Sequence, residues 1–502
     1  MMPTINLSAL YPEIIIALFA LIVLLLQSFA NIRGKNYFGY ISLIGIVTAF
    51  FVVVKHSPFD FKSVEYTFNG LWVVDNYSRF FKLIFLLGTG LTILISIKYV
   101  ENERIQNGEY FALILLATLG MMIMASGMEM MTIFLGLELM SISLYALAGF
   151  TRTRMISNEA ALKYFLLGSF ATGFLLYGMA LLYGATGTTS LNGISQFLAK
   201  THLQSPMPIL GMALLVIGFG FKIAAVPFHM WAPDVYQGAP SPITAFMSAG
   251  PKAAGFAAFV RVFVEALPTL HGEWVVLIWV MAVLTMTVGN IIALVQDNIK
   301  RMLAYSSIAH AGYVLVAFLC AGEMGISSIL YYMLAYTLMN IGAFAVITVL
   351  AGKGEEKVNI ADYNGLGYRH PVAAIAMSLF LFSLAGIPPT AGFMGKFYIF
   401  SAAIKQGYLG LAIIGVINSV VSVYYYLRVT IAMYMKEPAT SGESPALIFT
   451  RLHYRNPDFS LRSPAHGNIS FRLHRHCKAV LSCIAITIKG RKHRYEYGQV
   501  YN

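Results

Sequence analysis

Long apolar stretches separated by short polar segments run through the first 435 residues of the chain. A helix that crosses the hydrocarbon core of a bilayer needs about 20 mostly apolar residues. Thirteen stretches approach this length, and each is predicted to form a membrane-spanning helix. The predicted spans are 8–29, 38–54, 78–98, 110–126, 129–149, 160–184, 207–231, 242–264, 273–295, 302–321, 325–350, 371–395 and 407–434.

The composition excludes a soluble enzyme. Hydrophobic residues make up 58% of the 502 residues and charged residues only 11%, whereas a soluble domain carries about a quarter charged residues. We therefore predict an all-α polytopic membrane protein. The first apolar stretch lacks a basic N-terminal flank and a small-residue cleavage site, so we expect it to remain as the first span. No phosphate-binding glycine motif and no metal-site cysteine spacing occurs in the sequence, which argues against a nucleotide or metal site.

Basic residues in the loops predict the orientation of the chain. When alternate loops are assigned to opposite sides of the membrane, thirteen Lys and Arg residues fall on one side and six on the other. Cytoplasmic loops carry the excess of positive charge in membrane proteins. The N-terminus is therefore predicted outside, and the segment after the thirteenth span inside.

Four ionisable residues in or directly beside predicted spans stand out. Glu138 occupies the middle of the fifth span, in IFLGLELMSISLYAL, Lys222 and Lys252 belong to the seventh and eighth, and Lys396 directly follows the twelfth. A charge at the bilayer centre costs about 2.5–3.5 kcal/mol, so such residues usually face the bundle interior and serve ion or proton pathways. Burial disfavours the charged form of both acids and bases, so a buried glutamate and lysine can exchange a proton.

Three further charges lie near the ends of predicted spans. Lys82 is close enough to the start of the third span for its ammonium group to reach the membrane surface. Glu159 and Lys163 are four residues apart at the start of the sixth, a spacing that predicts a local ion pair. We expect a structural role for all three.

A proline accompanies the lysine of the seventh span. In GFGFKIAAVPFHMWAPDVYQGAPSP (218–242), Pro227 follows Lys222 by five positions. Proline cannot donate a backbone hydrogen bond and frees the carbonyl four residues earlier, and broken helices line ion sites in membrane transporters. His229 follows Lys222 by seven positions, so the two share a face if the helix persists. We predict His229 to be a proton relay.

Prolines recur beside the other two lysines. Pro251 directly precedes Lys252, and Pro388 and Pro389 precede Lys396. Helix breaks are therefore predicted at all of these prolines.

The tenth span contains YSSIAHAGY, in which Ser306 and His310 are four residues apart. That spacing places them on one face of a helix. A string of hydroxyl and imidazole groups can pass protons. The same pattern is equally typical of a histidine that is simply hydrogen-bonded in a core.

The broken seventh and twelfth spans are five helices apart, and each carries a lysine. An odd offset reverses the second copy in the membrane, so the pattern predicts two inverted five-helix repeats. The predicted organisation is a three-helix segment (1–106), a first repeat with spans four to eight (107–266), a second repeat with spans nine to thirteen (267–436) and an atypical basic tail (437–502).

Three stretches carry a family resemblance, namely KIAAVPFHMWAPDVYQGAPSPITAFMSAGPKAAGFA, KRMLAYSSIAHAGY and LAGIPPTAGFMGKFYIF. They resemble the antiporter-like membrane subunits of respiratory complex I, over about residues 10–435. Subunits M and L of that complex and cation/proton antiporters usually read HTWLPDAHxxAPTPVS, whereas this chain reads HMWAPDVYQGAPSPIT. The difference makes the chain similar to the subunit N branch of bacterial NADH-quinone oxidoreductases.

The resemblance implies proton translocation across the bacterial cytoplasmic (inner) membrane, driven by electron transfer from NADH to quinone in other subunits. It implies no catalytic chemistry and no cofactor in this chain, because FMN, the iron–sulfur clusters and quinone are bound in or with other subunits. The implied partners are subunit M, small membrane subunits and lipid, without nucleic acid. Two alternatives stay open: a secondary cation/proton antiporter subunit, and a non-conducting structural subunit of the same complex.

By matching motifs, the resemblance also implies a row of proton-carrying residues at mid-membrane. The implied members are Glu138, Lys222, Lys252 and Lys396, with Lys300 and His310 in less critical positions.

The C-terminal segment departs from the family, whose members usually have a fourteenth helix. From Glu437 onward the chain holds ten Lys and Arg residues and four Asp and Glu residues. Its longest apolar run is too short to span a bilayer. We hypothesise that a frameshift or a faulty gene prediction has replaced the fourteenth helix by this tail.

Overall fold

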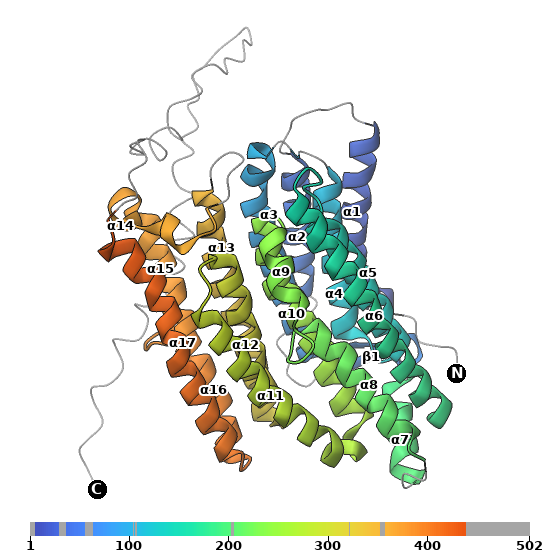
Figure 1. Cartoon of the computed structure of the whole chain (residues 1–502). Helices are drawn as coiled ribbons and strands as arrows, with labels where there is room; N and C mark the ends of the chain where they lie inside the picture. Colours follow the sequence, from blue (N-terminus) through green and yellow to red (C-terminus); the bar gives the residue numbers. More distant parts are fainter. Residues whose placement is uncertain are drawn as a thin grey trace, which may run out of the picture. The chain divides into compact units, whose positions relative to one another are not determined.

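A computed structural model describes residues 6–29, 37–55, 64–103, 105, 108–201, 205–320, 322–351 and 357–437. Apart from Glu437, the basic tail lies outside these residues, so its origin stays a hypothesis. The described chain is almost entirely helical (Figure 1), which confirms the predicted all-α class.

Seventeen α-helices occur within the described residues. The first seven are α1 (Tyr11–Phe29), α2 (Tyr37–Lys55), α3 (Asn76–Asn102), α4 (Gly108–Ser126), α5 (Met130–Ala148), α6 (Met155–Thr186) and α7 (Leu191–Thr201). The next six are α8 (Met207–Lys222), α9 (Trp231–Gly238), α10 (Ser241–Arg261), α11 (His271–Leu294), α12 (Ile299–Leu319) and α13 (Glu323–Leu350). The last four are α14 (Leu366–Arg369), α15 (Pro371–Ala385), α16 (Ala391–Lys405) and α17 (Leu409–Met435).

Short elements connect these helices. They are the 3-10 helices η1 (Leu7–Leu10), η2 (Phe68–Gly70), η4 (Pro268–Leu270) and η5 (Ile360–Tyr363), the π-helical turn η3 (Val262–Ala266), and the strands β1 (Glu65–Thr67) and β2 (Trp72–Val74). The two strands form an antiparallel hairpin in which Tyr66 is opposite Val73. The apolar pattern of the sequence did not predict this hairpin or α7, because both are too short to produce an apolar run of spanning length.

Eleven helical segments of the described chain are long and apolar enough to cross a membrane. Two of the thirteen predicted spans are instead pairs of short helices, α8 with α9 and α15 with α16. The exact number of thirteen and the inverted relation of the two repeats stay predictions.

The centre of the bundle is formed by α10 and α12. Nearly all of their residues are buried, and α10 contacts α3, α4, α12 and α13 (Figure 1). The α10 stretch SAGPKAAGFAA is rich in glycine, alanine and serine, which let neighbouring backbones approach closely. The two helices that carry Lys252 and His310 are therefore shielded from lipid by the rest of the bundle.

The seventh predicted span is interrupted for eight residues, 223–230, between α8 and α9. Ala224 adopts a positive φ of 57° and the Val226–Pro227 peptide is cis. A backbone amide in this connection and a backbone carbonyl at the end of α8 both have side-chain hydrogen-bond partners. The Val226 amide donates to Thr285 Oγ1 (3.0 Å), and Trp231 Nε1 donates to the Phe221 carbonyl (2.9 Å). Because such partners replace the missing helical bonds, the break is compatible with a buried position.

The twelfth predicted span is interrupted between α15 and α16. Gly386 has a φ of +84°, a conformation that residues with a Cβ atom rarely adopt. The Pro388–Pro389 peptide is cis, and the Thr390 side chain then accepts a hydrogen bond from the Phe393 amide (3.4 Å) at the start of α16. The interruption turns the carboxyl end of α15 towards the interior residues of α16.

The helix break predicted at Pro251 is wrong, because α10 continues through this residue. Pro251 has no amide hydrogen for the Met247 carbonyl, four residues earlier. The Tyr236 hydroxyl donates to that carbonyl from α9 (3.4 Å). The side chain of a neighbouring helix thus supplies a replacement hydrogen bond, and tight packing holds the helix together.

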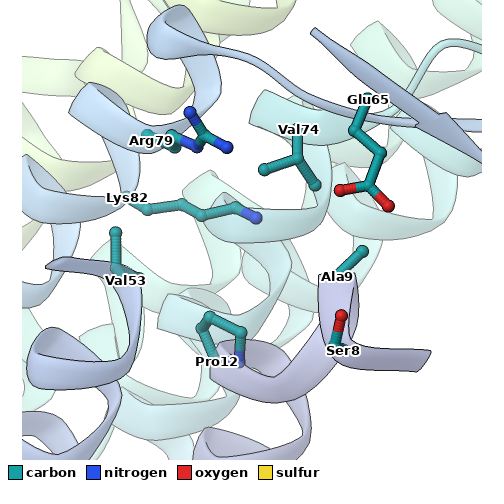
Figure 2. Close-up of a pocket in the computed structure, with 8 residues that line it drawn as sticks. All are labelled: Ser8, Ala9, Pro12, Val53, Glu65, Val74, Arg79 and Lys82. Atoms are coloured by element: carbon teal, nitrogen blue, oxygen red, sulfur yellow. The ribbon is translucent and has the colours of Figure 1, made fainter. Parts of the chain in front are cut away.

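The surface position predicted for Lys82 is also wrong. Lys82 is only 2% exposed, and its Nζ lies 2.7 Å from Oε1 of Glu13 in α1, which is 4% exposed. Figure 2 shows Lys82 extending from α3 into a pocket that is also lined by Arg79, Pro12 and Glu65. A carboxylate within reach makes a buried ion pair instead of an excursion to the membrane surface.

Close packing of α4 on α5 depends on glycine. A methyl group added to Gly120 would lie 2.5 Å from the Gly136 carbonyl oxygen and 2.6 Å from the Met140 amide nitrogen. Backbone atoms cannot yield as a flexible side chain can, so Gly120→Ala is expected to destabilise the protein by about 1–3 kcal/mol. Thermal denaturation of the purified complex measures this loss.

The control for that measurement is Gly184→Ala in α6, where an added methyl group meets nothing within 4 Å. It should leave the denaturation midpoint unchanged. Equal midpoints for the Gly120 and Gly184 variants would contradict the packing argument.

Candidate functional site

The first of the predicted site residues, Lys222, lies at the carboxyl end of α8, where the helix is interrupted. It is 5% exposed, and its Nζ donates to Ser141 Oγ of α5 (2.7 Å). The ammonium group also lies 5.8 Å from the ring centre of Tyr164. Lys222 is thus held by one hydroxyl and one aromatic face.

Glu138 lies on the same helix as Ser141, one turn away, and is half-buried. Its Oε1 accepts a hydrogen bond from Thr172 of α6 (2.9 Å). Glu138 and Lys222 interact electrostatically, although no direct ion pair between them occurs within the described residues. Ser141, which accepts from Lys222, lies one helical turn from Glu138, so the two charged groups lie near the same serine without a direct contact.

His229 lies in the non-helical connection between α8 and α9. Because the helix does not persist, the predicted sharing of one helix face with Lys222 does not apply. The imidazole is 7% exposed and interacts with the Pro227 carbonyl and with the charge of Lys252. His229 is therefore a buried imidazole in the interrupted segment, within electrostatic reach of the second lysine.

Lys252 lies at the middle of the buried helix α10. Its Nζ donates to the Ser307 carbonyl (2.9 Å) and to the Ser307 hydroxyl of α12, and it lies 5.9 Å from the ring centre of Tyr236. No carboxylate of the described chain forms an ion pair with it. Lys252 is therefore a buried base whose nearest partners are neutral.

His310 lies one turn beyond Ser306 in α12, as the spacing predicted. Its Nδ1 shares a hydrogen bond with the Tyr332 hydroxyl (2.5 Å), and its Nε2 with the Tyr426 hydroxyl (3.0 Å). Tyr426 also contacts the Ser306 hydroxyl. The imidazole interacts electrostatically with both Lys252 and Lys396. His310 therefore lies within a cluster of hydroxyl groups and within electrostatic reach of both lysines.

Lys396 of α16 points at the end of α15. Its Nζ donates to the carbonyls of Leu384 (3.1 Å) and Ala385 (2.9 Å) and to the Ser419 hydroxyl of α17 (2.8 Å). The last carbonyls of a helix have no partner within it and carry the negative end of the helix dipole. The second broken span thus places a helix end where it stabilises a buried ammonium group.

Lys300 at the start of α12 is fully buried, and its Nζ donates to the Ala239 carbonyl at the end of α9 (2.8 Å). Its place is therefore near one end of the bundle, away from the broken-helix lysines. The neighbouring Arg301 pairs with Asp234 (2.7 Å), which also pairs with Lys163 (2.8 Å). Lys163 reaches Glu159 as well, at 2.7 Å, as the four-residue spacing predicted.

Comparisons with known proteins identify the family of this chain. A family model described as NADH:quinone oxidoreductase/Mrp antiporter, transmembrane, matches residues 127–422. Subunit N of the NADH-quinone oxidoreductase of Trichlorobacter lovleyi is 56% identical over 434 residues, which cover 86% of this chain and 88% of that protein. The chain belongs to the subunit N family. The predicted family resemblance is thereby confirmed.

Solved structures agree with the subunit N assignment. A chain of respiratory complex I from Thermus thermophilus is 34% identical, with a TM-score of 0.73, covering 88% of this chain and 93% of that one. A chain of the Mrp complex of a Dietzia species has a TM-score of 0.78 at 21% identity, covering 87% of this chain and 82% of that one. The second match shows a shared fold alone.

Several polar residues that hydrogen-bond to the candidate site residues of this subunit N family member were not predicted from the sequence. They are Ser141, Thr172, Ser307, Tyr332, Ser419 and Tyr426. For Ser141 a signal existed, since it follows Glu138 by three positions and so lies on the same helix face. The tyrosines lie 22 and 116 residues from His310, and no spacing predicts such contacts.

Within the part of the chain that the structure describes, no group of three or more His, Cys, Asp or Glu side chains is placed to hold a metal ion. The polar atoms of the row are amine, imidazole and hydroxyl groups, each of which can hold or pass a proton.

Proposed function

We propose that this member of the subunit N family carries protons across the bacterial cytoplasmic membrane, as a non-redox subunit of a proton-translocating NADH-quinone oxidoreductase. The observation that supports it best is the series of buried basic groups Lys222, His229, Lys252, His310 and Lys396, in which Lys252 acts electrostatically on both histidines. Isolated buried charges are costly, so a series of them in a membrane points to a proton path.

In this proposal Glu138 sets the charge state of Lys222 through its own carboxylate. The proton passes from Lys222 through His229 or water to Lys252. It then moves through the hydroxyls of Ser307 and the tyrosines beside His310 towards Lys396. The hydrogen bonds around Lys252 and His310 support this order, and Lys300 serves as a secondary polar contact at the bundle end.

The drive comes from outside the chain. Moving one charge against 100 mV requires about 2.3 kcal/mol, and no residue of the proposed path releases energy of its own. The relatives are named for electron transfer between NADH and quinone, and we assign NADH, FMN, iron–sulfur clusters and quinone to other subunits. We expect other membrane subunits as neighbours, including subunit M and the small membrane subunits.

The proposed topology has the N-terminus outside and protons moving from the cytoplasm outwards. The loop charges support this orientation. The two repeats, 107–266 and 267–436, each contribute one interrupted helix pair with a lysine, α8 with α9 and α16 with α15. The identity to subunit N relatives favours this function over an independent antiporter, and the buried lysines favour it over a merely structural subunit.

NADH-driven proton uptake by vesicles that contain the reconstituted complex tests the function. Glu138→Gln and Lys222→Ala are each expected to lower pumping at least about tenfold, the consequence of losing about 1.4 kcal/mol of stabilisation of the charged intermediate. Glu159→Gln is the control, because Glu159 is 61% exposed and pairs only locally. Wild-type pumping by an assembled Lys222→Ala complex would overturn the proposed function.

A further inference from the structure

Tyr145 separates two cavities that lie one behind the other along α5 and α6. The outer cavity has a volume of about 430 Å³ and the inner one about 10 Å³. Tyr145 lines both. Among the described residues, no other residue lines both cavities, so the tyrosine marks the point where one ends and the other begins.

The outer cavity lies where α5 ends and α6 begins. Its walls include Gly149 and the exposed polar side chains of Glu109, Arg152 and Asn158. Its volume is large enough for many water molecules, since one molecule occupies about 30 Å³ in the liquid. The outer cavity is therefore an open mouth at one end of the bundle, with three polar or charged side chains in a mainly apolar wall.

The inner cavity reaches the candidate site. It is lined by Ser141 and Lys222, and by Thr172, which hydrogen-bonds to Glu138. Its volume of about 10 Å³ is close to the smallest that holds a single water molecule. Ser141 precedes Gly149 by eight residues along α5, which corresponds to about 12 Å of helix.

Tyr145 and Ser141, four residues apart on α5, line the inner cavity together, and Ser141 accepts a hydrogen bond from Lys222 at 2.7 Å. The ring packs edge-on against Tyr164, with 4.8 Å between centroids. Gly168 of α6 provides the room for this arrangement, because an added methyl group would lie 2.8 Å from Tyr145 Cζ and closer still to its hydroxyl oxygen.

We propose that Tyr145 is the gate of a proton uptake route, through which protons pass from the outer cavity by way of the Tyr145 and Ser141 hydroxyls to Lys222. The inference rests on the proposed function and names the residues by which the site is reached. The aromatic ring blocks bulk water, while the hydroxyl, in the same cavity lining as Ser141, carries the proton onward. Gly168 is a positioning residue, since it acts only through Tyr145.

The transfer conserves protons and changes no oxidation state. A hydronium ion in the outer cavity gives a proton to the Tyr145 oxygen as Tyr145 gives its own to Ser141. The Ser141 hydroxyl turns from the Leu137 carbonyl, to which it now donates, and gives its proton to the neutral Lys222 amine. One O–H bond breaks and one forms at each hydroxyl, and the net product is an ammonium group and a water molecule.

The first test measures NADH-driven pumping by the reconstituted complex. Tyr145→Phe, which removes the hydroxyl, and Gly168→Ala, which displaces it, are each expected to lower pumping about tenfold. The matched controls are Tyr177→Phe, at a residue that is 60% exposed on α6, and Gly173→Ala, where an added methyl group meets nothing within 4 Å. Both controls should pump at the wild-type rate.

The second test measures cysteine labelling to show whether the Tyr145 ring is a barrier. A membrane-impermeant cationic methanethiosulfonate is added from each side of the vesicles. Cys320, Cys477 and Cys483 are first replaced by serine. Ala146→Cys in the outer cavity should react from one side only. Leu137→Cys in the inner cavity should react at least about tenfold faster once Tyr145→Ala removes the ring, because the closed cavity is too small for the reagent.

The outcomes separate this route from the function itself. Normal pumping by Tyr145→Phe and Gly168→Ala, together with loss of pumping by Lys222→Ala, would overturn the route and leave the function intact. Normal pumping by all three would overturn the function as well. Rapid labelling of Leu137→Cys with Tyr145 in place would show that the ring is not a barrier.

Discussion

Replacing Lys252 by alanine is expected to lower NADH-driven proton pumping by roughly 100-fold, because a proton must then cross the buried centre without a base to hold it at a cost of about 2.5–3.5 kcal/mol. Lys252 acts electrostatically on both His229 and His310. Its ammonium group is held by Ser307 alone among side-chain hydrogen-bond acceptors in the described chain.

Lys252→Ala is also expected to change the rate of quinone reduction. If electron transfer and pumping are tightly coupled, the two rates fall together in Lys252→Ala and the ratio of protons to electrons stays unchanged. Lys405→Ala is the control, because Lys405 lies exposed at the end of α16. More than half of wild-type pumping by an assembled Lys252→Ala complex would show that Lys252 is not on the path.

Replacing Lys82 by methionine is expected to destabilise the N-terminal part of the bundle by about 3–5 kcal/mol, because the Glu13 carboxylate is then left buried without its counter-charge. The two groups are 2% and 4% exposed and 2.7 Å apart. The loss appears as a lower thermal denaturation midpoint of the purified complex and as less chain recovered in the membrane.

A double variant separates charge from packing. Glu13→Gln with Lys82→Met removes both charges and keeps the side-chain volumes nearly constant, and replacing both partners of a buried ion pair is often close to neutral. The double variant should therefore recover most of the stability that Lys82→Met alone has lost. A double variant no more stable than Lys82→Met would mean that the loss comes from packing around Lys82 in α3.

Much of the fold follows from the apolar pattern, because each long helix must cover its own backbone polar groups in lipid. The helices that the structure places in α1 to α6 begin and end within a few residues of the predicted spans, apart from the longer ends of α6. The hairpin and α7 escaped prediction because short amphipathic elements leave no such pattern. The break predicted at Pro251 does not occur. The Met247 carbonyl that Pro251 leaves without a helical partner accepts a hydrogen bond from the Tyr236 hydroxyl of another helix, and no local pattern predicts that contact.

The candidate site divides in the same way. The sequence identified Glu138 and the three lysines by their cost in an apolar environment, and their positions follow from single residues in long apolar runs. It also located the interruptions that accompany Lys222 and Lys396. It had no means to tell that Lys396 faces the carbonyls at the end of α15 while Lys222 faces a serine 81 residues away.

By itself, the amino-acid sequence determined the membrane class, the helical fold, the family and the identity of the costly charged residues, because each depends on local composition or on motifs within one segment. Only the tertiary structure decided which partners those charges have. It joined Lys82 to Glu13, brought His310 within electrostatic reach of Lys252 and Lys396, and placed Tyr145 in the lining of two cavities. The physical reason is that a side chain's partner depends on how helices pack and rotate against one another, and that packing is a property of the whole bundle.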